Sequence, residues 1–183
     1  MRKKLFLFLL MSVFLLPACS QQADEADKDA IAQPVLEAMF TCPNEELFDP
    51  DSISTIGLGT ENALGPEEIQ ALNESISQAW ESKFASSFTE DGFDTFITSG
   101  NNILYHAMAA VSGSSIQVDS IETAESPDDQ SPSVYTLSLS VDADGQTQQA
   151  VVDCSVTFDD EAKISDLSIT GDQSLQAIFL NLY

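Results

Sequence analysis

The chain has 183 residues, of which 30 are Asp or Glu, 6 are Lys or Arg and one is His, giving a formal net charge of −24. A surface this acidic repels the phosphates of nucleic acids and of anionic lipids, so roles in DNA, RNA or direct lipid-surface binding are disfavoured. The length is sufficient for one domain with a real hydrophobic core.

Residues 1–18 have the composition of a secretory signal peptide. Positive charges at residues 2–4 precede an almost unbroken apolar run over residues 5–16, and Ala18 is a small residue directly before Cys19. The run is too short to span a hydrocarbon core of about 30 Å, but it suits the apolar part of a signal. Removal of this segment leaves three Lys against 30 Asp and Glu, a formal charge of −27.

The stretch Leu16-Pro17-Ala18-Cys19 resembles the lipobox of bacterial lipoproteins. The resemblance implies a diacylglyceryl group on the Cys19 sulfur, cleavage before Cys19, and an anchor on the outer face of the cytoplasmic membrane. Two acyl chains hold a protein stably on a bilayer, whereas one chain holds it marginally. The alternative is an ordinary secreted protein in which Cys19 has no special role.

Residues 19–29 are small, polar and acidic, which predicts a disordered tether before a single domain over residues 30–183. Residues 30–41 predict the first helix, with Pro34 as a candidate start and Pro43 as its end. Its core-facing stripe is apolar throughout and comprises Ile31, Val35, Met39 and Cys42, flanked by Leu36 and Phe40.

Residues 47–64 lack a clear period and predict a long loop. Gly65-Pro66-Glu67-Glu68 is typical of a helix start, because Pro needs no donor there and Glu complements the helix dipole. The second helix then carries apolar residues at three- and four-residue steps, namely Ile69, Leu72, Ile76, Trp80, Phe84 and Phe88.

The segment after this helix predicts shorter helical pieces. Asp91-Gly92 is interpreted as a turn, and Phe93, Phe96 and Ile97 indicate a short helix or an irregular connector. Residues 101–111 predict a third helix, whose apolar face is formed by Leu104, Met108 and Val111.

From Ser115 onward the apolar period changes from 3.6 to 2, which predicts strands. Four strands are expected, around residues 116–121, 135–141, 150–158 and 167–169, with a bulge near Asp119-Ser120 and hairpin turns at 142–145 and 159–161. Each strand has one apolar face and one Ser, Thr or Asp face, as in an antiparallel meander packed on one side. Residues 172–183 predict a short C-terminal helix.

The expected fold is therefore α+β, with N-terminal helices packed on one face of a curved antiparallel four-stranded meander. This order of elements, over about residues 30–170, resembles the cystatin-like, nuclear transport factor 2-like cone, and more narrowly small Gram-positive lipoproteins of that shape and of unassigned function. One joint core is expected from both parts of the chain, containing Trp80, Phe84, Leu137, Leu139, Val152 and Val156.

His106 is the only histidine, which excludes a multi-histidine zinc site. Enzymes of the cystatin-like superfamily use Asp, His or Tyr inside the cone, which implies Tyr105, His106 and Tyr135 as pocket candidates. The alternative for His106 is a surface or hydrogen-bonded structural role. Residues 142–145 lack the register of a calcium loop and are interpreted as a hairpin turn. Neither a metal site nor a cofactor is predicted.

Cys42 and Cys154 remain once Cys19 is modified. An exported location permits a disulfide between them, but burial explains each side chain, so we expect two reduced thiols. The functional expectation is a non-enzymatic module that binds a small ligand or an exported protein. The alternative is a small pocket enzyme of the lyase or isomerase type, which would need ionisable groups that converge in an open cone.

Overall fold

The computed structural model describes residues 25–49, 64–124 and 131–182. The predicted signal peptide, Cys19 and the first part of the predicted tether lie outside the described residues, as does most of the predicted loop 47–64. Within the described ranges, no helix is both long enough and apolar enough to cross a bilayer.

Helices come first in the chain, then the strands, then a last short helix. The elements are α1 (Glu25–Phe40), α3 (Pro66–Phe84), the 3-10 turn η1 (Ala85–Ser87), α4 (Glu90–Ser99), α5 (Leu104–Ser112), β1 (Ser115–Ala124), β2 (Ser133–Ala143), β3 (Gln146–Phe158), β4 (Ile164–Gly171) and α6 (Gln173–Leu180). The predicted α+β class, the antiparallel meander and the C-terminal helix are confirmed.

The sheet has the order β1-β2-β3-β4, and all neighbours are antiparallel. The predicted bulge is confirmed, since the register between β1 and β2 shifts between Val118 and Ser120. β2 and β3 are joined by the two residues Asp144 and Gly145, with φ angles of 51° and 75°. Two successive positive φ angles are characteristic of a tight hairpin turn, which agrees with the interpretation of this segment.

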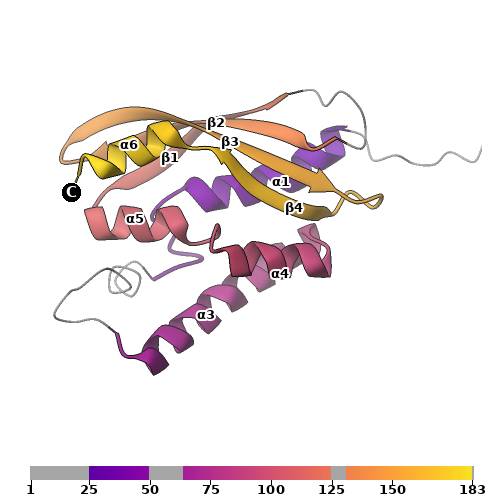
Figure 1. The fold of residues 1–183 in the computed structure, drawn as a ribbon, viewed down its shortest axis with the longest axis horizontal. Helices are drawn as coiled ribbons and strands as arrows, with labels where there is room; N and C mark the ends of the chain where they lie inside the picture. The colour runs from indigo at the N-terminus through magenta and orange to yellow at the C-terminus, as the bar shows by residue number, and fades with distance from the viewer. Residues whose placement is uncertain (1–24, 50–63, 125–130, 183) are drawn as a thin grey trace, which may run out of the picture.

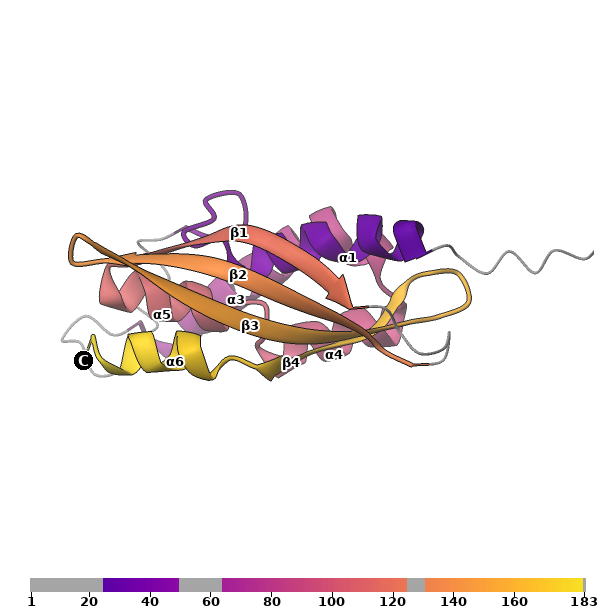
Figure 2. The ribbon, with the colours of Figure 1, turned by 90° about the horizontal axis from the view of Figure 1, so that it is seen from above.

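Helices cover one face of the sheet (Figure 1). Along β2, buried side chains alternate with more exposed ones, and the buried set comprises Ser133, Tyr135, Leu137, Leu139, Val141 and Ala143. Seen from above, α1 runs beside β1, whereas α4 and α5 lie under the sheet (Figure 2). The six residues expected in one core are all buried in a single hydrophobic cluster, as predicted.

Helix α1 begins earlier than predicted, so the boundary at residue 29 is wrong. Residues 25–29 are helical, and Asp29 accepts a hydrogen bond of 2.9 Å from the Thr123 hydroxyl on β1. Pro34 lies inside the helix rather than at its start, and it is exposed. The carbonyl that loses its helical partner belongs to the exposed Ala30, where water can satisfy it.

Helix α3 has its predicted start, but only its second half is buried. Ile69 remains 38% exposed, whereas Trp80 is fully buried with ring centroids 5.1 Å from Phe84 and 5.2 Å from Phe96. Phe88, which the spacing assigned to this helix, follows η1 and forms a bridge with Ile164 of β4. α3 therefore reaches the core through aromatic contacts of Trp80 with Phe96 of α4 and with Phe48, which follows α1.

Gly92 is not part of a turn, as its sequence context suggested, but lies in the first turn of α4. Thr89 caps this helix by accepting a hydrogen bond of 3.0 Å from the Gly92 amide. A β-carbon on Gly92 would lie 2.6 Å from the carbonyl oxygen of Ile164. Glycine is required here because the helix approaches the backbone of β4 closely.

The face predicted for α5 is wrong. Leu104 and Val111 are 41% and 36% exposed, whereas Tyr105, His106 and Ala109 are buried. Apolar residues occur all round this short helix, so their spacing does not select one face.

Helix α6 protects an edge of the sheet. The pairing between β3 and β4 covers residues 153–158 of β3, and α6 lies beside the earlier part of that strand. The Ser174 hydroxyl donates to the carbonyl oxygen of Val151 and accepts from its amide, each at 2.8 Å. These bonds replace the strand pairing that β4 does not provide.

Candidate functional site

The two tyrosines of the predicted site lie in the packed interior. The Tyr105 hydroxyl donates a hydrogen bond to Asp172, and its ring centroid lies 5.3 Å from that of Phe40. Burial and the bond to Asp172 raise the pKa of Tyr105 far above its usual range. Tyr135 is fully buried on the inner face of β2, opposite Cys154 on β3. Neither tyrosine is exposed to a ligand from solvent.

Unlike the two tyrosines, His106 lines a pocket, and its ring also bonds to the backbone of α1. Its Nε2 lies 3.0 Å from the carbonyl oxygen of Ala38. That carbonyl would ordinarily accept from the Cys42 amide, which instead donates to Ile116. Since a carbonyl can only accept, Nε2 carries the proton, and His106 caps the C-terminal turn of α1.

The remaining ring nitrogen of His106 is an unused acceptor. Nδ1 is buried and has no hydrogen-bond partner among the described residues. The ring packs on Phe48, with centroids 4.0 Å apart. Burial lowers the pKa of His106 to about 4, and the bond to Ala38 opposes this effect only in part. The imidazole is therefore neutral at pH 7, with a lone pair on Nδ1.

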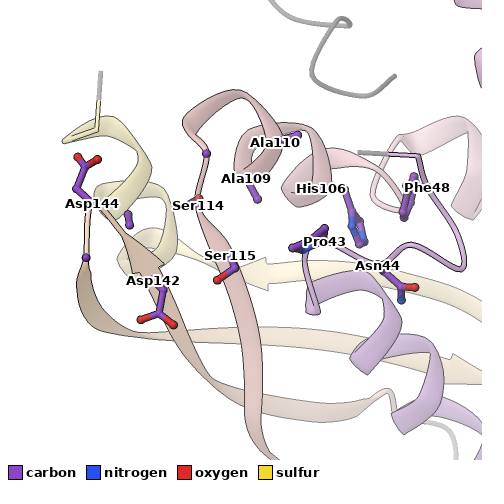
Figure 3. A pocket seen from close by; sticks show the side chains of 13 residues that line it. Pro43, Asn44, Phe48, His106, Ala109, Ala110, Ser114, Ser115, Asp142 and Asp144 are labelled. Carbon is purple, nitrogen blue, oxygen red and sulfur yellow. The ribbon is translucent and has the colours of Figure 1, made fainter. Parts of the chain in front are cut away.

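A pocket of about 590 Å³ lies beside His106, at the end of the fold where the β2–β3 hairpin turns. Three chain segments form its walls, and they contribute Pro43, Asn44, Phe48, His106, Ala109, Ala110, Gly113, Ser114, Ser115, Asp142, Ala143, Asp144 and Gly145. Figure 3 shows the His106 ring between Pro43 and Phe48, with the two aspartates across the pocket on the hairpin. The volume is typical of sites for small organic ligands.

The polar groups of the pocket wall differ in their exposure. Asp142 and Asp144 are exposed, and Asp142 accepts a hydrogen bond from the Thr147 hydroxyl. Ser114 is buried and shares a hydrogen bond of 2.7 Å with Ser112. The apolar part of the wall is formed by Pro43, Phe48, Ala109, Ala110 and Ala143.

Sequence reasoning identified only one member of this pocket as a site residue, His106. Asp142 and Asp144 were recognised as a hairpin turn, and Asn44, Phe48 and Ser115 were not singled out. These residues lie in segments far apart in the sequence, and no spacing within one segment indicates that they meet. The predicted trio is divided, because Tyr105 and Tyr135 are not part of the pocket wall.

Cys42 and Cys154 are both buried, and neither forms a disulfide. Cys42 pairs with Ile116, which lies opposite Val141, and Val141 lies opposite Gln148. Cys154 is six positions further along β3, a separation of about 20 Å along the strand. A disulfide requires Cα atoms within about 7 Å, so this fold does not bring the two thiols together.

Across residues 25–49, 64–124 and 131–182, no group of three or more His, Cys, Asp or Glu side chains is placed to hold a metal ion. The chain matches no protein-family model, no curated protein and no solved structure.

Proposed function

We propose that this chain is an extracytoplasmic lipoprotein, held on the outer face of the cytoplasmic membrane by the lipid on Cys19, and that its cystatin-like domain is a non-enzymatic binding module. The observation that carries the proposal is the pocket of about 590 Å³ between His106 and the β2–β3 hairpin. The lipobox-like stretch before the domain supports the anchor.

The β2–β3 hairpin, which forms one wall of the pocket, and the start of α1 lie at opposite ends of the fold (Figure 2). The Lys28 ammonium lies 5.8 Å from the ring of Phe158, at the far end of β3 from the hairpin. β3 has 13 residues, which corresponds to roughly 40 Å. The chain between Cys19 and Glu25 reaches at most about 20 Å. An anchor at Cys19 would therefore hold the end with Phe158 near the bilayer and leave the pocket free for ligands.

The ionisable groups favour binding over catalysis. The nitrogen of His106 that carries a proton is committed to Ala38, and a pKa of about 4 makes the other a weak base at neutral pH. The buried tyrosines Tyr105 and Tyr135 belong to the core. Among the described residues, the pocket wall does not bring together the general acid and general base that a lyase or isomerase would require.

The test is an NMR titration of the mature lipoprotein, labelled at alanine methyl groups and held in phosphatidylcholine nanodiscs, with the neutral aromatic probe indole. We expect shifts at Ala109, Ala110 and Ala143, which line the pocket, and none at Ala71 on exposed α3. Filling the pocket by Ala110→Trp should abolish them, whereas the control Ala71→Trp should not. Shifts that avoid the pocket, or that survive its filling, would show that the pocket is not the site.

A further inference from the structure

The charged side chains in the pocket wall are both acidic. They are Asp142 and Asp144, and the described residues of the wall include no Lys or Arg. The three lysines in the described part of the chain are engaged elsewhere: Lys28 lies over Phe158, Lys83 pairs with Glu46, and Lys163 lies 3.5 Å from Glu161. A bound ligand would therefore meet negative charge with no protein cation in the wall to balance it.

Two helix ends add to this negative potential. The C-terminal turn of α5 forms one wall through Ala109, Ala110 and Gly113. Pro43 and Asn44, on another wall, follow closely on the end of α1 at Phe40. The C-terminus of a helix carries about half a negative elementary charge, because the peptide dipoles along the helix are aligned. Both ends therefore favour a cation.

The rest of the wall favours a ligand that is larger and more apolar than a simple ion. Phe48, Pro43 and the alanines present apolar surface, which gains stability when covered by the body of a ligand. His106 adds a ring that is neutral at pH 7, because burial lowers its pKa, and a neutral ring does not repel a positive charge. Within the described part of the chain, the donor groups around the pocket fall short of the ligand set that a bound metal ion needs.

We infer that the pocket takes a small organic cation, an amine with an apolar or aromatic body, whose ammonium group lies toward Asp142 and Asp144 and whose body lies on Phe48 and the α5 wall. This inference rests on the proposed function, because it assigns a ligand class to the same site.

The experiment uses three probes with the same phenyl body and different charge: 2-phenylethylammonium, 2-phenylethanol and 3-phenylpropanoate. Each is titrated into the mature lipoprotein in phosphatidylcholine nanodiscs, with the methyl signals of Ala109, Ala110 and Ala143 as readout and empty nanodiscs as the partition control. We expect the cation to bind most tightly, the anion most weakly, and added salt to reduce the difference.

Two variants measure how much the carboxylates of Asp142 and Asp144 contribute to the affinity for the cation. In Asp142→Asn/Asp144→Asn, the affinity for the cation should fall about three- to tenfold, while that for the alcohol stays unchanged. Asparagine keeps an acceptor for Thr147 and tolerates the positive φ of residue 144. The matched control is Asp160→Asn, in the turn at the other end of β3, and it should leave the affinity for the cation unchanged.

The outcomes separate this inference from the proposed function. Equal binding of the three probes at the pocket, or a cation affinity that is the same in both variants, would overturn the choice of a cation and leave the binding site standing. An absence of shifts at the pocket with every probe would overturn the site and the ligand class together.

Discussion

The burial of His106 gives the fold a defined sensitivity to acid. The folded protein lowers the pKa of this residue from 6.5 to about 4, chiefly because a charged ring loses its hydration on burial. As the pH falls below 6.5, the unfolded chain takes up the proton first. The contribution of His106 to stability is therefore fully present above pH 6.5 and is lost as the pH falls toward 4.

The size of the effect follows from the pKa difference. Between pH 7 and pH 4.5, protonation of the unfolded state alone should lower the free energy of unfolding by about 2 kcal/mol. Protonation of the many carboxylates acts in the same window and reduces the self-repulsion of a chain with net charge −24. The effect of His106 must therefore be measured against a variant with the same carboxylates.

The assay is urea unfolding of the protein and of His106→Gln at several pH values. The difference in the free energy of unfolding between the two should change by about 2 kcal/mol from pH 7 to pH 4.5, with the wild type losing stability. An NMR titration of the His106 ring gives an independent reading, and its signals should stay those of a neutral imidazole down to about pH 5. A ring that titrates near 6.5, or a constant difference between the two proteins, would refute the reasoning.

Further predictions concern the core, the thiols and the anchor. Leu139→Ala should lower the free energy of unfolding in urea by about 2–5 kcal/mol, because it opens a cavity in the core. Val151→Ala, on the exposed face, should change it by less than about 0.5 kcal/mol. Equal effects of the two substitutions would contradict the assigned faces. Thiol counting on the denatured, unreduced protein should find two free thiols at Cys42 and Cys154, and native Cys154 should react slowly, because burial raises its pKa to about 12; the loss of both thiols would disprove the reduced state. Cys19→Ser should release the protein or leave its precursor unprocessed, as followed by fractionation and mass spectrometry, and normal membrane retention would contradict the anchor.

The strands could be predicted from the sequence because their period is simple. In β2, every second residue from Tyr135 to Val141 is buried, and the residues between them, which point to the other face of the sheet, are Ser or Thr. Only one orientation of such a strand places its apolar face on the core and its polar face in water. The hairpin was predictable for a related reason, since Asp144 and Gly145 tolerate the positive φ angles that a two-residue turn needs.

Other features could not be predicted, because they depend on contacts between segments that lie far apart in the sequence. The start of α1 has no apolar stripe of its own, and Asp29 within it accepts a hydrogen bond from Thr123 on β1. The role of Gly92 follows from the backbone of β4, more than seventy residues later. The buried face of α5 follows from its neighbours, because its own side chains are apolar all round.

The candidate pocket was predictable in part only. His106 was marked as a candidate because enzymes of the superfamily that the chain resembles use Asp, His or Tyr inside the cone, but its capping bond to Ala38 depends on how α1 and α5 cross. The pocket itself combines the end of α1, the end of α5 and the β2–β3 hairpin. Chain segments this far apart carry no common period, so tertiary packing decides that they meet.

The most direct test of an anchored module with an outward pocket is energy transfer from the protein to a labelled bilayer. Donor dyes are placed on Gln146→Cys, beside the hairpin, and on Glu161→Cys, at the other end of β3; both sites are exposed, whereas the native Cys42 and Cys154 are buried. The acylated protein is reconstituted in vesicles that contain an acceptor lipid. Strong transfer from residue 161 and weak transfer from residue 146 are expected. Equal or reversed transfer, or no association with the vesicles, would contradict the account.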